Sequence, residues 1–302
     1  MNIVFGPINS RRFGMSLGID LSPNKKSCNF DCVYCELKGA KPTNFIKDPP
    51  NVDEIITQVK NALKTHQNID VITLTANGEP TLYPQLETLV DRLNEIKTTQ
   101  KLLILSNGTG VLNPKICDAL KKIDIVKLSL DSVIQSTFNK IDRHKSDIKV
   151  ANLVEAMAKF RENFSGELVL EILVVAGFND TKDEFIALNE AINFIKPNRV
   201  DISTIDRPPA YIVKAVDLGL LKSLSELIIS TPTLIAKPHK SQNVYEFSKD
   251  EILSTLKRRP QSEANVSENF SQKSKAYLNE LLKDGLVAEC LVAGVKFYKV
   301  AK

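Results

Sequence analysis

The sequence of 302 residues has no apolar run of the roughly 18 residues needed to span a bilayer. Its start, MNIVFGPINSRRFGMSLGIDL, lacks the long apolar segment of a signal peptide. Lysine and arginine number 40 against 36 acidic residues, and this net charge of +4 is too small to demand a polyanionic partner. No internal repeat or low-complexity segment is visible. We therefore expect a cytoplasmic protein with no membrane contact.

Cysteine is scarce and unevenly placed. Of the five cysteines, Cys28, Cys32 and Cys35 fall within eight residues, while Cys117 and Cys290 stand alone. An odd count without a secretory signal argues against a disulfide framework and favours metal ligation by the trio. The three histidines, His66, His144 and His239, show no ligand spacing.

The bulk composition, 43% hydrophobic and 25% charged, is typical of a globular protein. Apolar segments rich in β-branched residues alternate with helix-period segments, as in repeated βα units. Several strand segments are almost continuously apolar, which indicates a parallel sheet covered on both faces. Six strands predict a partial (β/α)6 TIM-like barrel, with its site in the loops that follow the strands. The expected strands are 16–21, 71–76, 102–106, 125–130, 168–176 and 199–204.

The expected helices are 52–65, 84–97, 114–123, 148–164 and 182–195, with Asn51, Asn113 and Asp180 as N-caps of three of them. The βα pattern stops near residue 230, where TPTLIAKPHKSQN reads as a linker. We expect a barrel over 1–229, a linker over 230–245 and a small domain over 246–302. In the small domain, three helical segments precede a β-ribbon that turns at 293–294, an order similar to a winged helix-turn-helix.

The segment Cys28-Asn-Phe-Asp-Cys32-Val-Tyr-Cys35 follows the first expected strand. Thiolates are soft ligands that suit iron-sulfur clusters and zinc. Three of them around a 4Fe-4S cluster leave one iron open for a small molecule. Zinc would need a fourth ligand, for which Cys117 or a histidine is available.

With Tyr34 directly before its third cysteine, this triplet resembles the signature of the radical S-adenosylmethionine (SAM) superfamily. The resemblance implies a 4Fe-4S cluster on Cys28, Cys32 and Cys35, with SAM on the open iron. It also implies reductive cleavage of SAM to a 5'-deoxyadenosyl radical that abstracts hydrogen from a substrate, and an electron donor such as flavodoxin or ferredoxin.

Later motifs fit the same family in the same order. Asn77-Gly78-Glu79-Pro80-Thr81-Leu82 resembles its GGEP element, which receives the ammonium group of SAM, with Asn77 in place of the first glycine. The alternative is a turn in which Glu79 stabilises the start of a helix. The resemblance marks eight residues as candidates for SAM binding: Tyr34, Gly78, Glu79, Pro80, Ser106, Asn107, Ser129 and Asp131. The last four lie at the ends of two strands, and each of them could instead form a turn or cap.

The opening GPINSRRFGMSLGID and Arg207-Pro208-Pro209 are similar to the branch that contains the tRNA wyosine base synthases. Those enzymes have further cysteines upstream, and no cysteine precedes Cys28 here, so their own reaction is not implied. Arg11, Arg12 and Arg207 could bind an anionic substrate, or they could tie the N-terminal segment to the barrel through acidic partners.

Three readings of function follow from these residues. The first is a radical SAM oxidoreductase acting on an unidentified substrate, with tRNA or another RNA as candidates. The second is an iron-sulfur redox-sensing transcription regulator in which Gln272, Lys273 and Lys275 of the winged helix touch nucleic acid; a zinc-stabilised binding module is a third. Five βα units and the NGEPTL segment would be superfluous in a sensor, so the enzyme is favoured.

Overall fold

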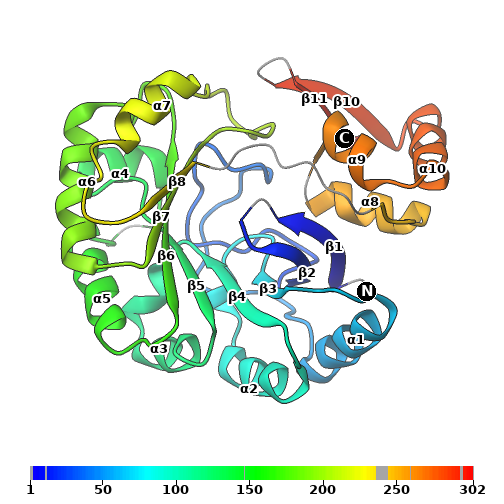
Figure 1. The fold of residues 1–302 in the computed structure, drawn as a ribbon, viewed down its shortest axis with the longest axis horizontal. Helices are drawn as coiled ribbons and strands as arrows, with labels where there is room; N and C mark the ends of the chain where they lie inside the picture. Colours follow the sequence, from blue (N-terminus) through cyan, green and yellow to red (C-terminus); the bar gives the residue numbers. More distant parts are fainter. Residues whose placement is uncertain are drawn as a thin grey trace.

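The computed structural model describes residues 3–10, 12–145, 147–235, 244–258, 260–292 and 295–301. One curved sheet follows the chain order (Figure 1). Its strands are β1 Val4–Ser10, β2 Gly14–Asp20, β3 Val71–Thr75, β4 Lys101–Ser106, β5 Ile125–Ser129, β6 Glu167–Val174, β7 Arg199–Thr204 and β8 Thr233–Ile235. β1 pairs antiparallel with β2, and every later pair is parallel. The fold is thus the expected partial α/β barrel.

Helices cover the outer face of this sheet (Figure 1). They are α1 Val52–Thr65, α2 Leu86–Ile96, α3 Pro114–Leu120, α4 Gln135–Asp142, α5 Val150–Glu162, α6 Lys182–Ile195 and α7 Leu218–Ser225, with short 3-10 helices η1 Pro80–Leu82 and η2 Thr109–Leu112. Their apolar stripes pack on the near-continuous strands in one large core. In the described part of the chain, no helix is long and apolar enough to cross a membrane.

The predicted N-caps are right in two cases of three. Asn51 accepts a hydrogen bond from the amide of Asp53, and Asn113 accepts one from Lys115. The third prediction is wrong, because Thr181 caps α6 and Asp180 instead accepts from the amide of Gly177. The Thr181 hydroxyl accepts a hydrogen bond from the amide of Glu184, the third residue of the helix, as is typical of an N-cap.

All six expected strands form, within about two residues of their expected ends. The strands β1 and β8 were not expected. β1 contains the pair Gly6-Pro7 and lies at one edge of the sheet, and β8 is three residues long at the other edge. β8 lies inside the segment interpreted as a linker, so the barrel continues at least to Ile235. Residues 236–243, which include His239, lie outside the described residues.

The C-terminal unit, residues 244–301, has its own apolar cluster around Phe247, Ile252 and Leu278. It consists of α8 Lys249–Arg258, β9 Gln261–Ser262, α9 Glu263–Asn269, α10 Gln272–Lys283, β10 Val287–Val292 and β11 Val295–Val300. The sheet order is β10-β11-β9, all antiparallel. The unit lies on the β1 side of the barrel (Figure 1), where the Tyr245 hydroxyl is 3.1 Å from the sulfur of Met15. The three helices and the two ribbon strands form as expected, the turn expected at 293–294 lies outside the described residues, and the winged-helix classification stays a prediction.

Candidate functional site

The three neighbouring cysteines lie in a long irregular segment between β2 and α1, here called the cysteine loop (residues 21–51). Its backbone is hydrogen-bonded to the barrel at several places, two of which lie next to cysteines. Ser27 donates to the carbonyl of Asn77 at 2.8 Å, and Val33 donates to the carbonyl of Ile141 at 2.8 Å. The loop therefore spans the carboxyl ends of the strands, where a parallel barrel builds its site.

Gly78 makes the first of these ties possible. Its φ is +137°, and a Cβ at this position would lie 1.9 Å from the carbonyl oxygen of Ser27. The backbone of the cysteine loop thus touches the NGEP segment directly, through a parallel bridge between Ser27 and Gly78. A side chain would push the two segments apart.

The three thiols line one cavity of about 300 Å³, here called the thiol cavity. Six of the eight residues predicted to bind SAM line the same cavity: Tyr34, Gly78, Glu79, Ser106, Asn107 and Ser129. Segments more than a hundred residues apart in sequence thus meet at one place. Neither the cysteine triplet nor the NGEP segment alone could have shown this. Pro80 and Asp131 are absent from this wall. Pro80 begins the 3-10 helix η1, a position that suits its fixed φ.

The thiols are shielded and hydrogen-bonded. Cys28 Sγ accepts from the amide of Phe30 at 3.4 Å and lies 3.8 Å from Nδ2 of Asn107. Cys32 Sγ donates to Oδ1 of Asp142 at 3.4 Å. Burial raises the pKa of Cys28 to about 12 and the pKa of Cys32 well above its usual value. Without metal these groups are thiols at neutral pH, so ligation must release protons.

The donor set fits an iron-sulfur cluster. Three sulfurs surround a single cavity, while among the described residues no group of three or more His, Cys, Asp or Glu side chains is placed to hold a single metal ion. Two of the fourth ligands considered for zinc, Cys117 and His144, are engaged elsewhere. Cys117 Sγ donates to the carbonyl of Val111, and His144 bonds to Asn139 and stacks on Phe138.

Glu79 is fully enclosed, with 1% of its surface exposed. Its Oε1 accepts from the amide and hydroxyl of Thr81 and from the hydroxyl of Ser106, and its Oε2 accepts from the amide of Asn107 at 2.7 Å. Burial raises its pKa, against these hydrogen bonds. Glu79 thus caps η1, as the structural alternative expected, and it also fixes the end of β4 beside the thiols.

Asn29, inside the cysteine triplet, was missed by the sequence reasoning. Its Oδ1 accepts from Nδ2 of Asn107 at 2.7 Å, and its Nδ2 donates to the hydroxyl of Thr109. This amide ladder joins the cysteine loop to the end of β4. The one feature of the sequence that could have indicated Asn29 is its position between the candidate ligands Cys28 and Cys32.

Asp131 lies behind the cavity wall rather than on it. Its Oδ2 accepts the Tyr34 hydroxyl at 2.5 Å, and its Oδ1 accepts the amide of Leu173 at 2.8 Å. Burial raises the pKa of Asp131 to about 7. Asp131 thus contacts Tyr34, which does line the cavity, and a direct contact of Asp131 with SAM stays a prediction.

The segment that follows β7 makes a further connection to the cysteine loop. The amide of Ala210 donates to the carbonyl of Cys35 at 2.7 Å, and the Tyr211 hydroxyl donates to Asp31 at 2.6 Å. The guanidinium of Arg143 stacks on the Tyr211 ring at 3.7 Å and pairs with Asp31. Tyr211 and Arg143 carry no motif, so the sequence did not indicate them.

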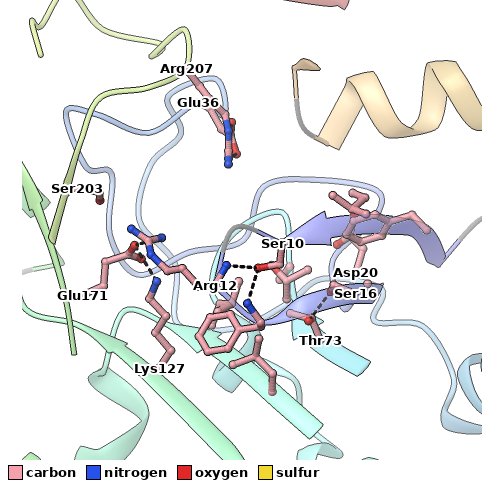
Figure 2. Close-up of a pocket in the computed structure, with 18 of the residues that line it drawn as sticks. Ser10, Arg12, Ser16, Asp20, Glu36, Thr73, Lys127, Glu171, Ser203 and Arg207 are labelled. Carbon is pink, nitrogen blue, oxygen red and sulfur yellow. Dashed lines mark hydrogen bonds and ion pairs between the residues drawn. The ribbon is translucent and has the colours of Figure 1, made fainter. Parts of the chain in front are cut away.

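A further cavity of about 340 Å³, here called the interior cavity, lies inside the barrel and shares a wall with the thiol cavity. The residues common to both are Glu36, Leu37, Leu105, Lys127 and Glu171. In Figure 2, Arg12, Lys127 and Glu171 converge on one side of the interior cavity, and Arg207 and Glu36 lie together on another. Phe13 and Leu103 help to line it and join an inner apolar cluster with Val71, Ile125 and Val169.

The arginines considered as anion binders are paired with acids. Arg12 contacts Oε1 of Glu171 at 3.2 Å and Oδ2 of Asp201 at 3.3 Å. Arg207 contacts Oε1 of Glu36 at 3.2 Å. These contacts agree with the alternative in which Arg12 and Arg207 tie segments together through acidic partners. Arg11 lies outside the described residues.

Two of the three C-terminal residues considered for nucleic-acid contact are engaged within their own unit. Lys273 pairs with Glu246 at 2.6 Å, and Lys275 donates to the carbonyl of Ser267 at 2.8 Å. Gln272 is the first residue of α10, after the cap Ser271. Local pairing offsets the positive charge that a phosphate backbone would seek.

Comparison with known proteins agrees with this geometry. The family model of the Radical SAM superfamily matches residues 26–189. A UPF0026 protein of Helicobacter pylori is 37% identical over 302 residues, which cover 98% of this chain and 97% of the relative.

Two solved structures are similar in fold. SuiB of Streptococcus suis, bound to its precursor peptide SuiA, superposes with a TM-score of 0.59 at 15% identity, over 74% of this chain and 48% of SuiB. A structure of TYW1 with a lysine-pyruvate adduct bound gives a TM-score of 0.50 at 15% identity, over 70% of this chain and 72% of TYW1. At this identity the likeness concerns the fold alone.

Proposed function

Because the chain belongs to the radical SAM superfamily, whose enzymes use a 4Fe-4S cluster and SAM, we propose that Cys28, Cys32 and Cys35 are the ligands of that cluster. We further propose that SAM occupies the rest of the thiol cavity, against Tyr34, Gly78, Glu79, Ser106, Asn107 and Ser129. One observation carries the proposal: the three thiols and these six residues line one cavity at the carboxyl ends of the strands.

The chain's own residues prepare this cavity in three ways. The thiols give up their protons on ligation, and the amides of Phe30 and Asn107 face the Cys28 sulfur and favour its thiolate. Glu79 holds Ser106 and Asn107 in place and puts negative charge where an ammonium group would lie. Phe30, Leu37 and Leu105 line the cavity with apolar surface that excludes water.

When bound, the cluster and SAM supply reductive cleavage of the sulfonium and the hydrogen abstraction that follows. We propose that the electron comes from a small donor such as flavodoxin or ferredoxin, and that the reaction takes place in the cytoplasm. The substrate is unidentified, and tRNA or another RNA is the candidate retained from the wyosine-synthase resemblance.

The test is anaerobic reconstitution with iron and sulfide, followed by SAM, a reductant and chromatography for 5'-deoxyadenosine, with and without cellular tRNA. We expect about four irons per chain and 5'-deoxyadenosine above the protein-free control. Replacing Cys28, Cys32 and Cys35 together by Ala should abolish both signals, and Cys117→Ala is the matched control that should keep them. Unchanged iron content in the triple variant would refute the ligand assignment. A rise in product with tRNA supports an RNA substrate.

A further inference from the structure

The interior cavity contains ion pairs at both of its charged ends (Figure 2). Lys127 Nζ lies 2.8 Å from Oε1 of Glu171 and 3.1 Å from Oδ2 of Asp201, and Arg12 contacts the same two carboxylates. Arg207 is paired with Glu36. Each of the three cations on this wall thus already has a carboxylate partner.

The balance of charge on the wall is slightly negative. Among the described residues that line the cavity, the cations Arg12, Lys127 and Arg207 face four acids, Asp20, Glu36, Glu171 and Asp206. Within the described part of the chain, Arg12 Nε and Nη2 have no hydrogen-bond partner, but both atoms are buried, so a phosphate or carboxylate could reach this guanidinium only by displacing one of the acids. The displaced acid would then be left unpaired in a mostly buried place, which is strongly unfavourable.

Glu171 is the member of this network that a ligand can reach. Its side chain is 27% exposed, against 11% for Arg12, 5% for Lys127 and 0% for Asp201. Both cations contact the same oxygen, Oε1. Glu171 also lies on the wall shared with the thiol cavity, so a group bound to it would lie beside the cofactor.

We propose that the interior cavity binds the reacting part of the substrate, that this part carries an amine in its ammonium form, and that Glu171 accepts its hydrogen bond. Arg12 and Lys127 are positioning residues that hold the carboxylate through Oε1. The inference rests on the proposed function for the meaning of "substrate", and it excludes a phosphate group from the interior. An RNA substrate would have to insert an amine-bearing, cationic group and keep its phosphates outside.

Binding of three matched probes to the cluster-loaded protein tests this proposal. Cyclohexylammonium, cyclohexanecarboxylate and cyclohexyl phosphate share one ring and differ in charge; their affinities are measured by anaerobic calorimetry at pH 7.5, with and without SAM. We expect saturable binding of the ammonium probe alone, and Glu171→Gln should weaken it about tenfold because a charge-assisted hydrogen bond is lost. Ser203→Phe should abolish binding by filling the cavity without altering an ion pair.

Tighter binding of the carboxylate or phosphate probe would overturn the proposal. So would an ammonium affinity that Ser203→Phe or a folded Glu171→Gln leaves unchanged. If Glu171→Gln weakens SAM instead of the probe, Glu171 belongs to the cofactor and the proposal is wrong. Thermal melting checks the folding of both variants. The probes report binding without turnover, so a protein that binds ammonium but makes no 5'-deoxyadenosine would refute the proposed function alone.

Discussion

The barrel and the C-terminal unit use charged residues in opposite ways. In the barrel, the carboxylates of Glu79, Asp131 and Asp201 are almost fully buried, and each is held by specific hydrogen bonds or ion pairs near a cavity. In the C-terminal unit, pairs such as Lys273–Glu246 lie at the surface, with both side chains 58% exposed. Buried pairs fix geometry at a high cost if one member is lost, whereas exposed pairs contribute little. The difference locates the chemistry in the barrel.

The largest contrast is expected between two glycines. Gly78→Ala puts a Cβ against the Ser27 carbonyl, and we expect a loss of more than about 3 kcal/mol in the free energy of unfolding, together with most of the bound iron. Gly285, in the C-terminal unit, also has positive φ but open space around it, so Gly285→Ala should cost about 1 kcal/mol and keep the iron. Urea unfolding and iron analysis measure both; equal losses would remove the contrast.

A second contrast concerns two glutamates. Glu79→Gln removes negative charge from the cavity wall and leaves the amide of Asn107 facing an NH2 group or a weaker acceptor. We expect about ten- to a hundredfold weaker SAM binding to the cluster-loaded protein, measured by equilibrium dialysis. Glu246→Gln, at an exposed pair of the C-terminal unit, should leave SAM affinity unchanged. Unaltered affinity in a folded Glu79→Gln protein would restrict Glu79 to its capping role.

A third contrast concerns the pH dependence of the free energy of unfolding. An unfolded Asp titrates near 3.9, and burial raises the pKa of Asp131 to about 7, so the native protein binds an extra proton between these values. The contribution of Asp131 to the free energy of unfolding is therefore complete below about pH 4. It declines as the pH rises to about 7, which gives the free energy of unfolding a downward slope against pH. Asp131→Asn should flatten this slope in urea unfolding from pH 5 to 8, while Asp284→Asn in the C-terminal unit should leave it intact. An unchanged slope in the first variant would contradict the buried proton.

Removal of the C-terminal unit tests directly whether the barrel folds and works without it. A chain that ends after Ile235 keeps all eight strands of the barrel sheet and loses the Tyr245 contact with Met15. We expect a soluble protein that binds the cluster and forms 5'-deoxyadenosine within about twofold of the full chain, as two units with separate cores should allow. Aggregation or loss of iron would mean that the unit completes the barrel.

The smallest effect is expected at the surface of the C-terminal unit. Lys273→Ala removes one member of an exposed pair, so thermal melting and the affinity for cellular tRNA should both stay within experimental error of the wild type. A clear loss of tRNA affinity would instead support the nucleic-acid role considered for α10.

Periodicity was sufficient to predict the barrel, because strands buried on both faces are almost continuously apolar and the helices between them are amphipathic. It could not predict β8, whose three residues take their conformation from pairing with β7. The thiol cavity was predictable where residues form motifs, as at Cys28 and Gly78. Asn29, Asp142 and Tyr211 were not, because their roles depend on contacts across the barrel that have no local pattern.

The wall shared by the two cavities links their occupants thermodynamically. Lys127 and Glu171 face both spaces, so a ligand that reorients either side chain in one cavity changes the free energy of binding in the other. Such linkage is reciprocal: the factor by which an interior ligand tightens the cofactor equals the factor by which the cofactor tightens that ligand. A cofactor titration repeated at rising ligand concentration would therefore report on a substrate before any product is identified.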